Sequence, residues 1–329
     1  SILKQYWGYD AFRGQQEQII KTVLEGKNVL GLLPTGAGKS LCYQVPALAK
    51  GGCCLVVSPL VALMKDQVER LKSIGIKAEA LFSGMPYWMM DRILDNAIYG
   101  DTQFLYVSPE RIQTELMQHR LNKLPLSLIA IDEAHCVSQW GFDFRPAYLQ
   151  LESVQEMHPS VPVIALTATA TPKVEEDIIV QLNLKNPTKF KQSFIRSNIA
   201  YRIWKRNDKK TALLELVKKY NGSGIVYARS RRACEELSAW LKDNNCNASF
   251  YHAGLHREER DRRQSDWQNN VTQTMVCTNA FGMGIDKPDV QLVAHWHLPD
   301  SMEAYYQEAG RVGRDGNQAF AYLLYNKRD

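Results

Sequence analysis

Cysteine is scarce in this 329-residue chain, with seven residues in total, and none of them forms a Cys-x-x-Cys pair or a Cys/His cluster at zinc-ligand spacing. The cysteines stand singly, or as the adjacent pair Cys53 and Cys54, and mostly lie inside apolar runs. The sequence therefore predicts neither a structural zinc site nor a disulfide framework. Unpaired thiols of this kind are typical of a reducing cytosol, so we expect a cytoplasmic protein without zinc.

Long hydrophobic runs, a signal-peptide pattern, internal repeats and low-complexity tracts are also missing. We therefore expect neither a membrane partner nor a solenoid fold. The net charge of +5 is small for this length, and a basic groove or an evenly solvated surface would both give this sum. The chain starts at Ser1 without a methionine, as a fragment would.

Hydrophobic residues are plentiful, at 45% of the chain, and they form short apolar runs between longer segments with helical spacing. Strands that alternate with helices predict an α/β fold of mainly parallel sheets with helices on both faces. The pattern weakens into a polar stretch between Leu184 and Lys210, so we expect two domains, residues 1–197 and 198–329. The predicted strands are Val29–Leu33, Cys53–Val57, Phe104–Val107, Leu128–Ile131, Val163–Leu166, Gly224–Tyr227, Ala248–Tyr251, Thr274–Cys277, Gln291–Ala294 and Ala319–Leu324.

The most informative stretch, at positions 33–40, reads Leu-Pro-Thr-Gly-Ala-Gly-Lys-Ser and follows a predicted strand. Its glycines let the backbone turn so that N–H groups point at phosphate oxygens. The lysine adds a positive charge near the β- and γ-phosphates, and the serine hydroxyl is placed to hold Mg²⁺. Leucine replaces the first glycine of the general pattern, and a plain Gly-rich turn is the alternative. The predicted nucleotide-binding residues here are Thr35, Gly36, Gly38, Lys39 and Ser40.

Two adjacent acids, Asp132 and Glu133, directly follow a predicted strand. Hydrolysis of a phosphoanhydride needs one carboxylate to hold Mg²⁺ and another to orient and deprotonate the attacking water. We assign Asp132 to the metal and Glu133 to the water. The alternative, two acids that cap a helix, is common for an isolated Asp-Glu pair, but it is disfavoured once a phosphate loop lies upstream.

The second predicted domain carries two arginines three residues apart, Arg311 and Arg314. Guanidinium groups that reach a γ-phosphate accelerate hydrolysis by about three to five orders of magnitude in related enzymes. An arginine pair satisfied by surface acids is the alternative, and the motif on its own favours that interpretation.

Together, these motifs in this order resemble the two RecA-like lobes of a superfamily-two helicase with a DEAH box. Further stretches narrow the resemblance to the RecQ family of DNA helicases. A stretch that resembles that family's adenine-recognition motif lies at Trp7–Gln16, and one that resembles the aromatic-rich loop after the DEAH box lies at His135–Pro146. Two more stretches resemble second-lobe motifs and lie at Tyr251–Leu255 and Ala280–Pro288.

The resemblance implies ATP and Mg²⁺, bound between the two lobes. Tyr9 can stack on adenine and Gln16 offers its amide to the base edge, although packing of the N-terminal helix is an alternative for both. By analogy with the family, Arg314 is the arginine finger and Arg311 its partner. The same analogy places further residues near the nucleotide, namely Arg13, Gln307, Gly282 and Asp286.

The loop after the DEAH box holds Trp140, Phe142, Phe144 and Arg145. Aromatic faces and a guanidinium suit a single strand, because bases stack on the rings and the charge follows the phosphates. An aromatic cluster packed under a loop is the alternative. Many relatives carry histidine where this chain has Phe142, so a hydrogen-bonding role for that position is in doubt. Backbone phosphates are expected at loops that follow strands, through Ser58, Ser108, Arg229 and Thr278.

We therefore predict an ATP-dependent DNA helicase of RecQ type, with DNA-stimulated ATP hydrolysis on single-stranded and forked DNA. The family implies 3′-to-5′ movement, roles and partners in DNA repair and recombination, and association with the nucleoid in a bacterium. Nothing in the sequence requires more than a monomer. Relatives commonly add a zinc-binding segment and a winged helix, and neither appears before Asp329. A nucleotide-gated DNA-binding module that does not unwind is therefore the rival hypothesis, and an RNA-unwinding enzyme is a weaker one.

Overall fold

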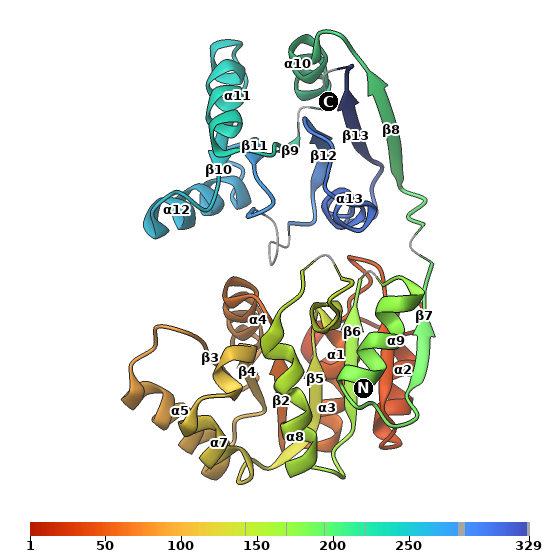
Figure 1. Cartoon of the computed structure of the whole chain (residues 1–329), viewed down its shortest axis with the longest axis vertical. Helices are drawn as coiled ribbons and strands as arrows, with labels where there is room; N and C mark the ends of the chain where they lie inside the picture. The colour runs from red at the N-terminus through yellow and green to blue at the C-terminus, as the bar shows by residue number, and fades with distance from the viewer. Residues whose placement is uncertain (142, 169, 194, 221, 282–286, 328–329) are drawn as a thin grey trace. The chain divides into compact units, whose positions relative to one another are not determined.

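The computed structural model describes residues 1–141, 143–168, 170–193, 195–220, 222–281 and 287–327. The chain divides into two compact units, residues 1–194 and 195–329, close to the boundary expected after residue 197. Figure 1 shows that each unit consists of a sheet flanked by helices.

The described part of the first unit forms a seven-stranded sheet with the order β3-β4-β2-β5-β6-β1-β7. Every neighbouring pair of these strands is parallel. The strands are β1 (Val29–Leu32), β2 (Cys53–Val57), β3 (Ala78–Leu81), β4 (Phe104–Val107), β5 (Leu126–Ile131), β6 (Val163–Thr167) and β7 (Thr188–Lys191). The helices are α1 (Ile2–Trp7), α2 (Gln16–Leu24), α3 (Leu41–Lys50), α4 (Val61–Ser73), α5 (Tyr87–Tyr99), α6 (Pro109–Ile112), α7 (Glu115–Leu121), α8 (Glu152–Met157) and α9 (Pro172–Gln181), with the 3₁₀ turns η1 (Ala134–Val137) and η2 (Pro146–Leu151).

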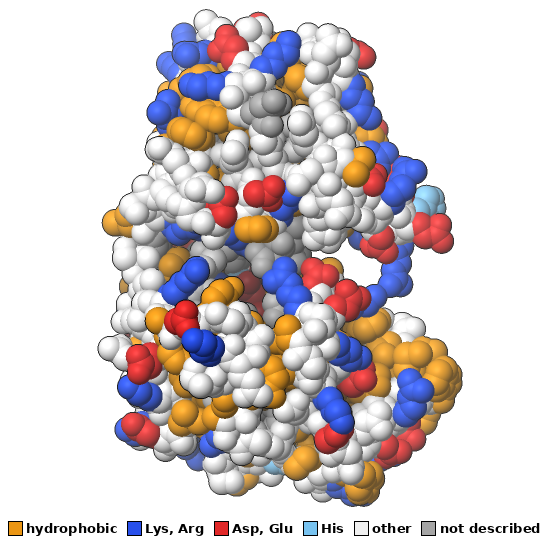
Figure 2. Space-filling view, turned by 180° about the vertical axis from the view of Figure 1, so that it is seen from behind, with side chains coloured by type: hydrophobic (Ala, Val, Ile, Leu, Met, Phe, Trp, Pro, Cys, Tyr) orange, Lys and Arg blue, Asp and Glu red, His pale blue; other side chains and the backbone are white. Residues whose placement is uncertain are grey.

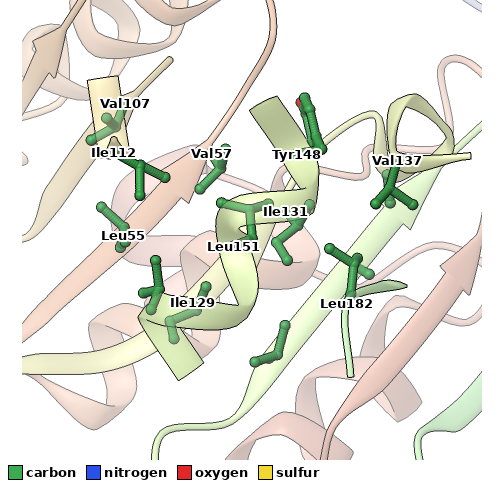
Figure 3. Packing of buried hydrophobic residues seen from close by; sticks show 14 of the residues in the cluster. Leu55, Val57, Val107, Ile112, Ile129, Ile131, Val137, Tyr148, Leu151 and Leu182 are labelled. Carbon is green, nitrogen blue, oxygen red and sulfur yellow. The ribbon is translucent and has the colours of Figure 1, made fainter. Parts of the chain in front are cut away.

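Helices cover both faces of this sheet because alternate strand residues point to opposite sides. On β2, Leu55 and Val57 pack with α5 to α9, whereas Cys54 and Val56 pack with α2, α3 and α4. Figure 3 shows the first of these cores, in which Tyr148 packs among aliphatic side chains of the central strands. Fully burying one such aliphatic side chain stabilises the fold by about 1.5–3 kcal/mol. The two cores hold the strand ends, and the loops that follow them, in fixed positions.

The described part of the second unit forms a six-stranded sheet with the order β10-β11-β9-β12-β13-β8, again with parallel pairs throughout. Helices α10 and α11 pack on one face, while α12 and α13 contribute to the core on the other. The strands are β8 (Ile199–Lys205), β9 (Ser223–Tyr227), β10 (Ala248–Tyr251), β11 (Thr274–Cys277), β12 (Val290–His295) and β13 (Ala319–Tyr325). The helices are α10 (Lys209–Lys219), α11 (Arg231–Asp243), α12 (Arg257–Gln268) and α13 (Met302–Ala309).

The predicted α/β fold with parallel sheets and helices on both faces is confirmed, and each apolar run expected to be a strand is one. The sequence pattern missed β3, β7 and β8, which are edge strands of the two sheets. Edge strands are buried less completely, and β7 alternates half-buried and exposed residues, so none of the three presents a continuous apolar run.

The surface carries charges of both signs. Figure 2 shows Lys and Arg side chains interspersed with Asp and Glu on the face that it presents, rather than gathered into a patch of one sign. The seven cysteines are all unpaired thiols, and every one except the half-buried Cys246 is buried. No helix among the described residues combines the length and apolarity that a membrane crossing needs.

Candidate nucleotide-binding and nucleic-acid-binding sites

The predicted phosphate loop connects the end of β1 to the start of α3. Gly36 and Gly38 have φ angles of 83° and 71°, a left-handed conformation that residues with a Cβ rarely adopt. Ser40 is the residue before the first turn of α3. The sequence thus forms a glycine turn at a helix N-terminus, which is a geometry suited to an anion.

Gln16, at the start of α2, braces this loop. Its side-chain Nε2 donates to the carbonyl oxygens of Ala37 at 3.0 Å and Gly38 at 3.2 Å, and its Oε1 accepts from the Arg13 backbone N–H at 2.9 Å. A Cβ on Gly38 would lie 2.5 Å from this Nε2, so the glycine is also needed for the close approach. The predicted contact of Gln16 with adenine stays a prediction, and the amide would have to exchange some of these bonds to make it.

Tyr9 is 49% exposed, and the Arg13 guanidinium carbon lies 5.8 Å from the centroid of its ring. An exposed aromatic face beside a guanidinium is available for stacking. The predicted role of both residues in adenine binding remains a prediction.

Asp132 lies directly after β5, and its backbone N–H donates to the Val57 carbonyl at 2.9 Å. Burial, followed by the charge of Glu133, raises the pKa of the Asp132 carboxyl to about 7, and the charge of Lys39 acts in the opposite direction. The structure therefore brings Asp132 within electrostatic range of the phosphate-loop lysine. A buried carboxylate with a raised pKa is stabilised by any nearby cation.

Glu133 adopts the left-handed conformation, with φ 49° and ψ 46°, which costs a residue with a side chain about 1–2 kcal/mol. Its Oε2 lies 3.4 Å from Nδ1 of His135, and the same Nδ1 lies 2.8 Å from Oγ1 of Thr167. Burial lowers the pKa of His135, so the ring is neutral at pH 7. The histidine is thus hydrogen-bonded to the end of β6 and lies beside the Glu133 carboxylate.

The aromatic-rich loop, residues 136–146, contacts helix α9. Trp140 is 64% exposed, and Nζ of Lys173 lies 3.1 Å from the centroid of its ring. The Ser138 hydroxyl donates to the Asp177 carboxylate at 2.7 Å and accepts from the Trp140 backbone N–H at 3.1 Å. The sequence analysis missed Lys173 and Asp177. Their i,i+4 spacing, which places them on one helix face, was the available signal.

The Arg145 side chain forms hydrogen bonds within the first unit. Its Nη1 donates to the Pro59 carbonyl at 3.0 Å, and its Nε donates to the Asp143 carboxylate at 3.3 Å. Phe144 is half-buried, whereas Phe142 lies outside the described residues. Arg145 therefore ties the loop to the segment after β2, and its predicted phosphate contact stays a prediction.

The predicted phosphate contacts differ in accessibility. Ser58 and Ser108 are buried, and neither hydroxyl has a hydrogen-bond partner, so a phosphate can reach them only if their loops move. Arg229 is exposed and donates to the Leu298 carbonyl at 3.0 Å. Thr278 is half-buried at the end of β11. These four contacts remain predictions.

In the second unit, Arg311 follows the C-terminal end of α13 and lies within electrostatic range of the buried Tyr227, whose hydroxyl donates to the Phe281 carbonyl at 3.3 Å. Within α13, Glu308 accepts from Nε2 of the buried His295 at 2.7 Å. The structure thus ties α13 to the end of β12. Gln307 and Arg314 are both half-buried, and Gly282 and Asp286 lie outside the described residues.

Two family matches cover most of the chain. Residues 13–178 match the DEAD/DEAH box helicases, and residues 208–316 match the helicase conserved C-terminal domain. The chain belongs to the DEAD/DEAH box helicase family. The first match includes the phosphate loop and the Asp132–Glu133 pair, and the second includes both arginines.

Within this family the chain is similar to RecQ helicases, at 40–44% identity over its whole length. The chain is 44% identical to the ATP-dependent DNA helicase RecQ of Haemophilus influenzae. The match covers the whole of this chain and 53% of that protein. The chain spans about half the length of the curated relatives it matches first.

Solved helicases share the fold. The helicase Lhr of Mycobacterium smegmatis, bound to single-stranded DNA and AMP-PNP, superposes with a TM-score of 0.80 at 22% identity, over 98% of this chain and 47% of that one. Dbp5 of S. cerevisiae, bound to RNA and ADP BeF3, superposes with a TM-score of 0.79 at 18% identity. The match covers 99% of this chain and 87% of Dbp5. These likenesses confirm the RecA-like architecture of the helicase core.

Proposed function

We propose that this chain is the RecQ-type motor of an ATP-dependent DNA helicase that couples ATP hydrolysis to movement on single-stranded DNA. The observation that carries the proposal is that the half-buried Asp132 lies within electrostatic range of Lys39, because an acid near a phosphate-loop lysine is the arrangement that phosphoanhydride cleavage requires. The relatives at 40–44% identity named as ATP-dependent DNA helicases support it.

A magnesium ion fits the Asp132 side of this site. Among the described residues, no three His, Cys, Asp or Glu side chains gather into a metal-binding cluster. Mg²⁺ needs no such cluster, since it commonly takes one or two protein oxygens together with water and phosphate oxygens. We propose Asp132 and the Ser40 hydroxyl as those oxygens. The cation would neutralise phosphate charge. It would also stabilise the charged form of the Asp132 carboxyl, whose pKa burial raises to about 7.

In the proposed reaction, Glu133 orients the attacking water and accepts its proton. The neutral His135 lies beside the Glu133 carboxylate and is hydrogen-bonded to Thr167. Arg311 and Arg314 of the second unit would complete the site when the two units close on ATP, and their guanidinium charge would stabilise the charge that develops on the γ-phosphate. Tyr9, Arg13 and Gln16 would favour an adenine base.

Single-stranded DNA is the proposed track, with bases stacking on Trp140. Stacking on an aromatic side chain is worth about 1–3 kcal/mol per base, whereas an exposed cation–π contact is worth about 0.5–1 kcal/mol. A base can therefore displace Lys173 from the Trp140 ring. The relatives named as ATP-dependent DNA helicases support the choice of ligand. We further propose 3′-to-5′ movement, action on forked DNA in repair, and a monomeric state.

Strand displacement tests the proposal. With ATP and Mg²⁺, the 329-residue chain is expected to release the short strand of a 3′-tailed duplex. It should not release the short strand of a 5′-tailed duplex. In a Lys39→Ala variant, loss of the phosphate contact should lower hydrolysis by about 10²–10³-fold and abolish displacement. DNA-stimulated hydrolysis without displacement would favour a nucleotide-gated DNA-binding module, and stronger stimulation by RNA would favour an RNA helicase.

A Trp140→Ala variant is expected to lose DNA stimulation of ATP hydrolysis while its basal rate stays unchanged, because the stacking surface is removed but the phosphate site is not. The half-saturating DNA concentration should rise about 5- to 150-fold, the equivalent of one lost stack. Trp88→Ala is the matched control, since Trp88 is 61% exposed and has Arg92 over its ring at 5.7 Å, outside this loop. Unchanged stimulation in Trp140→Ala would exclude the loop as the DNA sensor.

A further inference from the structure

The backbone of the arginine segment, residues 310–316, is held by a side chain from the start of the second unit. Arg196 donates from Nη1 to the Gly310 carbonyl at 3.3 Å and from Nη2 to the Val312 carbonyl at 3.2 Å. The same Nη2 also donates to the Gly313 carbonyl. One guanidinium therefore binds three backbone carbonyl groups around Arg311.

Asn198 adds a second attachment to the same segment. Its Nδ2 donates to the carbonyl oxygens of Gly313 at 2.7 Å and Asn317 at 2.9 Å. Gly313 has a φ of +59°, and a Cβ there would lie 2.6 Å from this Nδ2. The glycine thus supplies both the left-handed turn and the space into which the amide fits.

One of these bonds satisfies a carbonyl group at a helix end. The last carbonyl groups of a helix lack partners within it, and Gly310 is the cap residue directly after α13. Burial lowers the pKa of Arg196, so the guanidinium has given up part of its hydration to make these contacts. A planar fork of N–H donors can serve several carbonyls at fixed angles, which a lysine ammonium cannot do in the same way.

On its other side, the same stretch of chain is attached to β1, the strand that precedes the phosphate loop. Strand β7 pairs with β1, and the backbone N–H of Gln192 donates to the Leu32 carbonyl at 3.0 Å, directly before the loop. Residues 193–195 are all that separates Gln192 from Arg196. A short covalent connection thus runs from a hydrogen bond beside the phosphate loop to hydrogen bonds on the arginine segment.

We propose that Arg196 and Asn198 are positioning residues. They fix the arginine segment to the stretch of chain that connects the two units, so that Arg311 and Arg314 move together with that stretch. This inference rests on the proposed ATPase function. Neither residue need touch ATP. Their effect is to hold the backbone from which the two guanidinium groups project, and a displacement of about 1 Å can cost roughly 10²-fold in rate.

Steady-state kinetics of the 329-residue chain with single-stranded DNA test this proposal. Arg196→Ala should lower kcat for ATP hydrolysis by about 10²-fold while the KM for ATP changes little, because the phosphate loop and adenine contacts are untouched. Arg196→Lys should give an intermediate kcat, and millimolar guanidinium ion should restore part of the lost rate of Arg196→Ala. Asn198→Ala should lower kcat less, since Arg196 remains.

The matched control is Arg202→Ala. Arg202 is exposed on β8 and contacts the rings of Phe320 and Tyr322 and the hydroxyl of Tyr322. Arg202 carries the same charge as Arg196 without contacting the arginine segment. The kcat of Arg202→Ala should therefore match that of the unsubstituted chain.

The possible outcomes are distinct. Loss of kcat with KM and melting temperature retained, together with rescue by guanidinium, supports the positioning role. A kcat within about twofold of the unsubstituted chain in folded Arg196→Ala overturns it. If Arg196→Ala does not fold, Arg196→Lys and Asn198→Ala decide, and unchanged kcat in both overturns the proposal. Absence of DNA-stimulated hydrolysis in the unsubstituted chain would instead refute the proposed function.

Discussion

Replacement of Arg314 by alanine is expected to slow DNA-stimulated ATP hydrolysis by about 10³–10⁵-fold while ATP still binds. The physical reason is that a guanidinium placed at the γ-phosphate stabilises charge that is present mainly in the transition state, so its loss affects kcat more than binding. Arg314→Lys should recover little of the rate, because the ammonium lacks the planar fork. Single-turnover hydrolysis at saturating ATP and single-stranded DNA measures the effect.

The control for this variant is Arg257→Ala. Arg257 is an exposed residue of α12 that pairs with Asp261 four residues further on, so the substitution removes one positive charge from the second unit without touching the arginine segment. A rate for Arg314→Ala within about tenfold of the control, far short of the loss of an arginine finger, would refute the assignment.

A Glu133→Gln variant is expected to bind ATP and DNA normally but to hydrolyse ATP about 10²–10⁴-fold more slowly, the usual effect of removing a general base. Glutamine has nearly the same shape, so the left-handed turn and the approach to His135 can persist. The amide cannot accept a proton from water, and the loss should therefore appear in kcat. Equilibrium binding of a fluorescent ATP analogue, measured beside single-turnover hydrolysis, separates binding from chemistry.

Glu156→Gln provides the comparison for this variant. Glu156 is exposed on α8, and its substitution removes the same charge from the first unit. If Glu133→Gln hydrolyses ATP as fast as Glu156→Gln, another group must activate the water, and the proposed role of Glu133 would be wrong.

The central strands could be predicted from the sequence because they are buried on both faces. Strand β2, for example, is apolar at every position. Strands β7 and β8 lie at sheet edges, where exposed positions accept lysine and arginine, so their composition resembles that of a linker. The polar stretch that marked the domain boundary thus contains the last strand of one sheet and the first strand of the other.

The candidate site was predictable where a motif is local in sequence. The phosphate loop and the Asp132–Glu133 pair each need only one strand and the turn after it. The contacts of Gln16 with the phosphate loop and of Lys173 with Trp140 join separate segments of the chain, so a motif within one segment does not identify both partners. Arg196 is the clearest example, because its carbonyl partners lie more than a hundred residues away.

The thiols have a practical consequence for measuring how the two units move. Burial raises the pKa of each cysteine, to about 12 for Cys42, Cys53 and Cys234, and it is the cause with the largest effect in every case. Since the thiolate is the reactive form, native side chains should react slowly with maleimide dyes near neutral pH. With the half-buried Cys246 replaced by serine, one cysteine introduced on the exposed surface of each unit would carry a fluorophore over a low background. Energy transfer between the two dyes could then follow the units through a cycle of nucleotide binding and release.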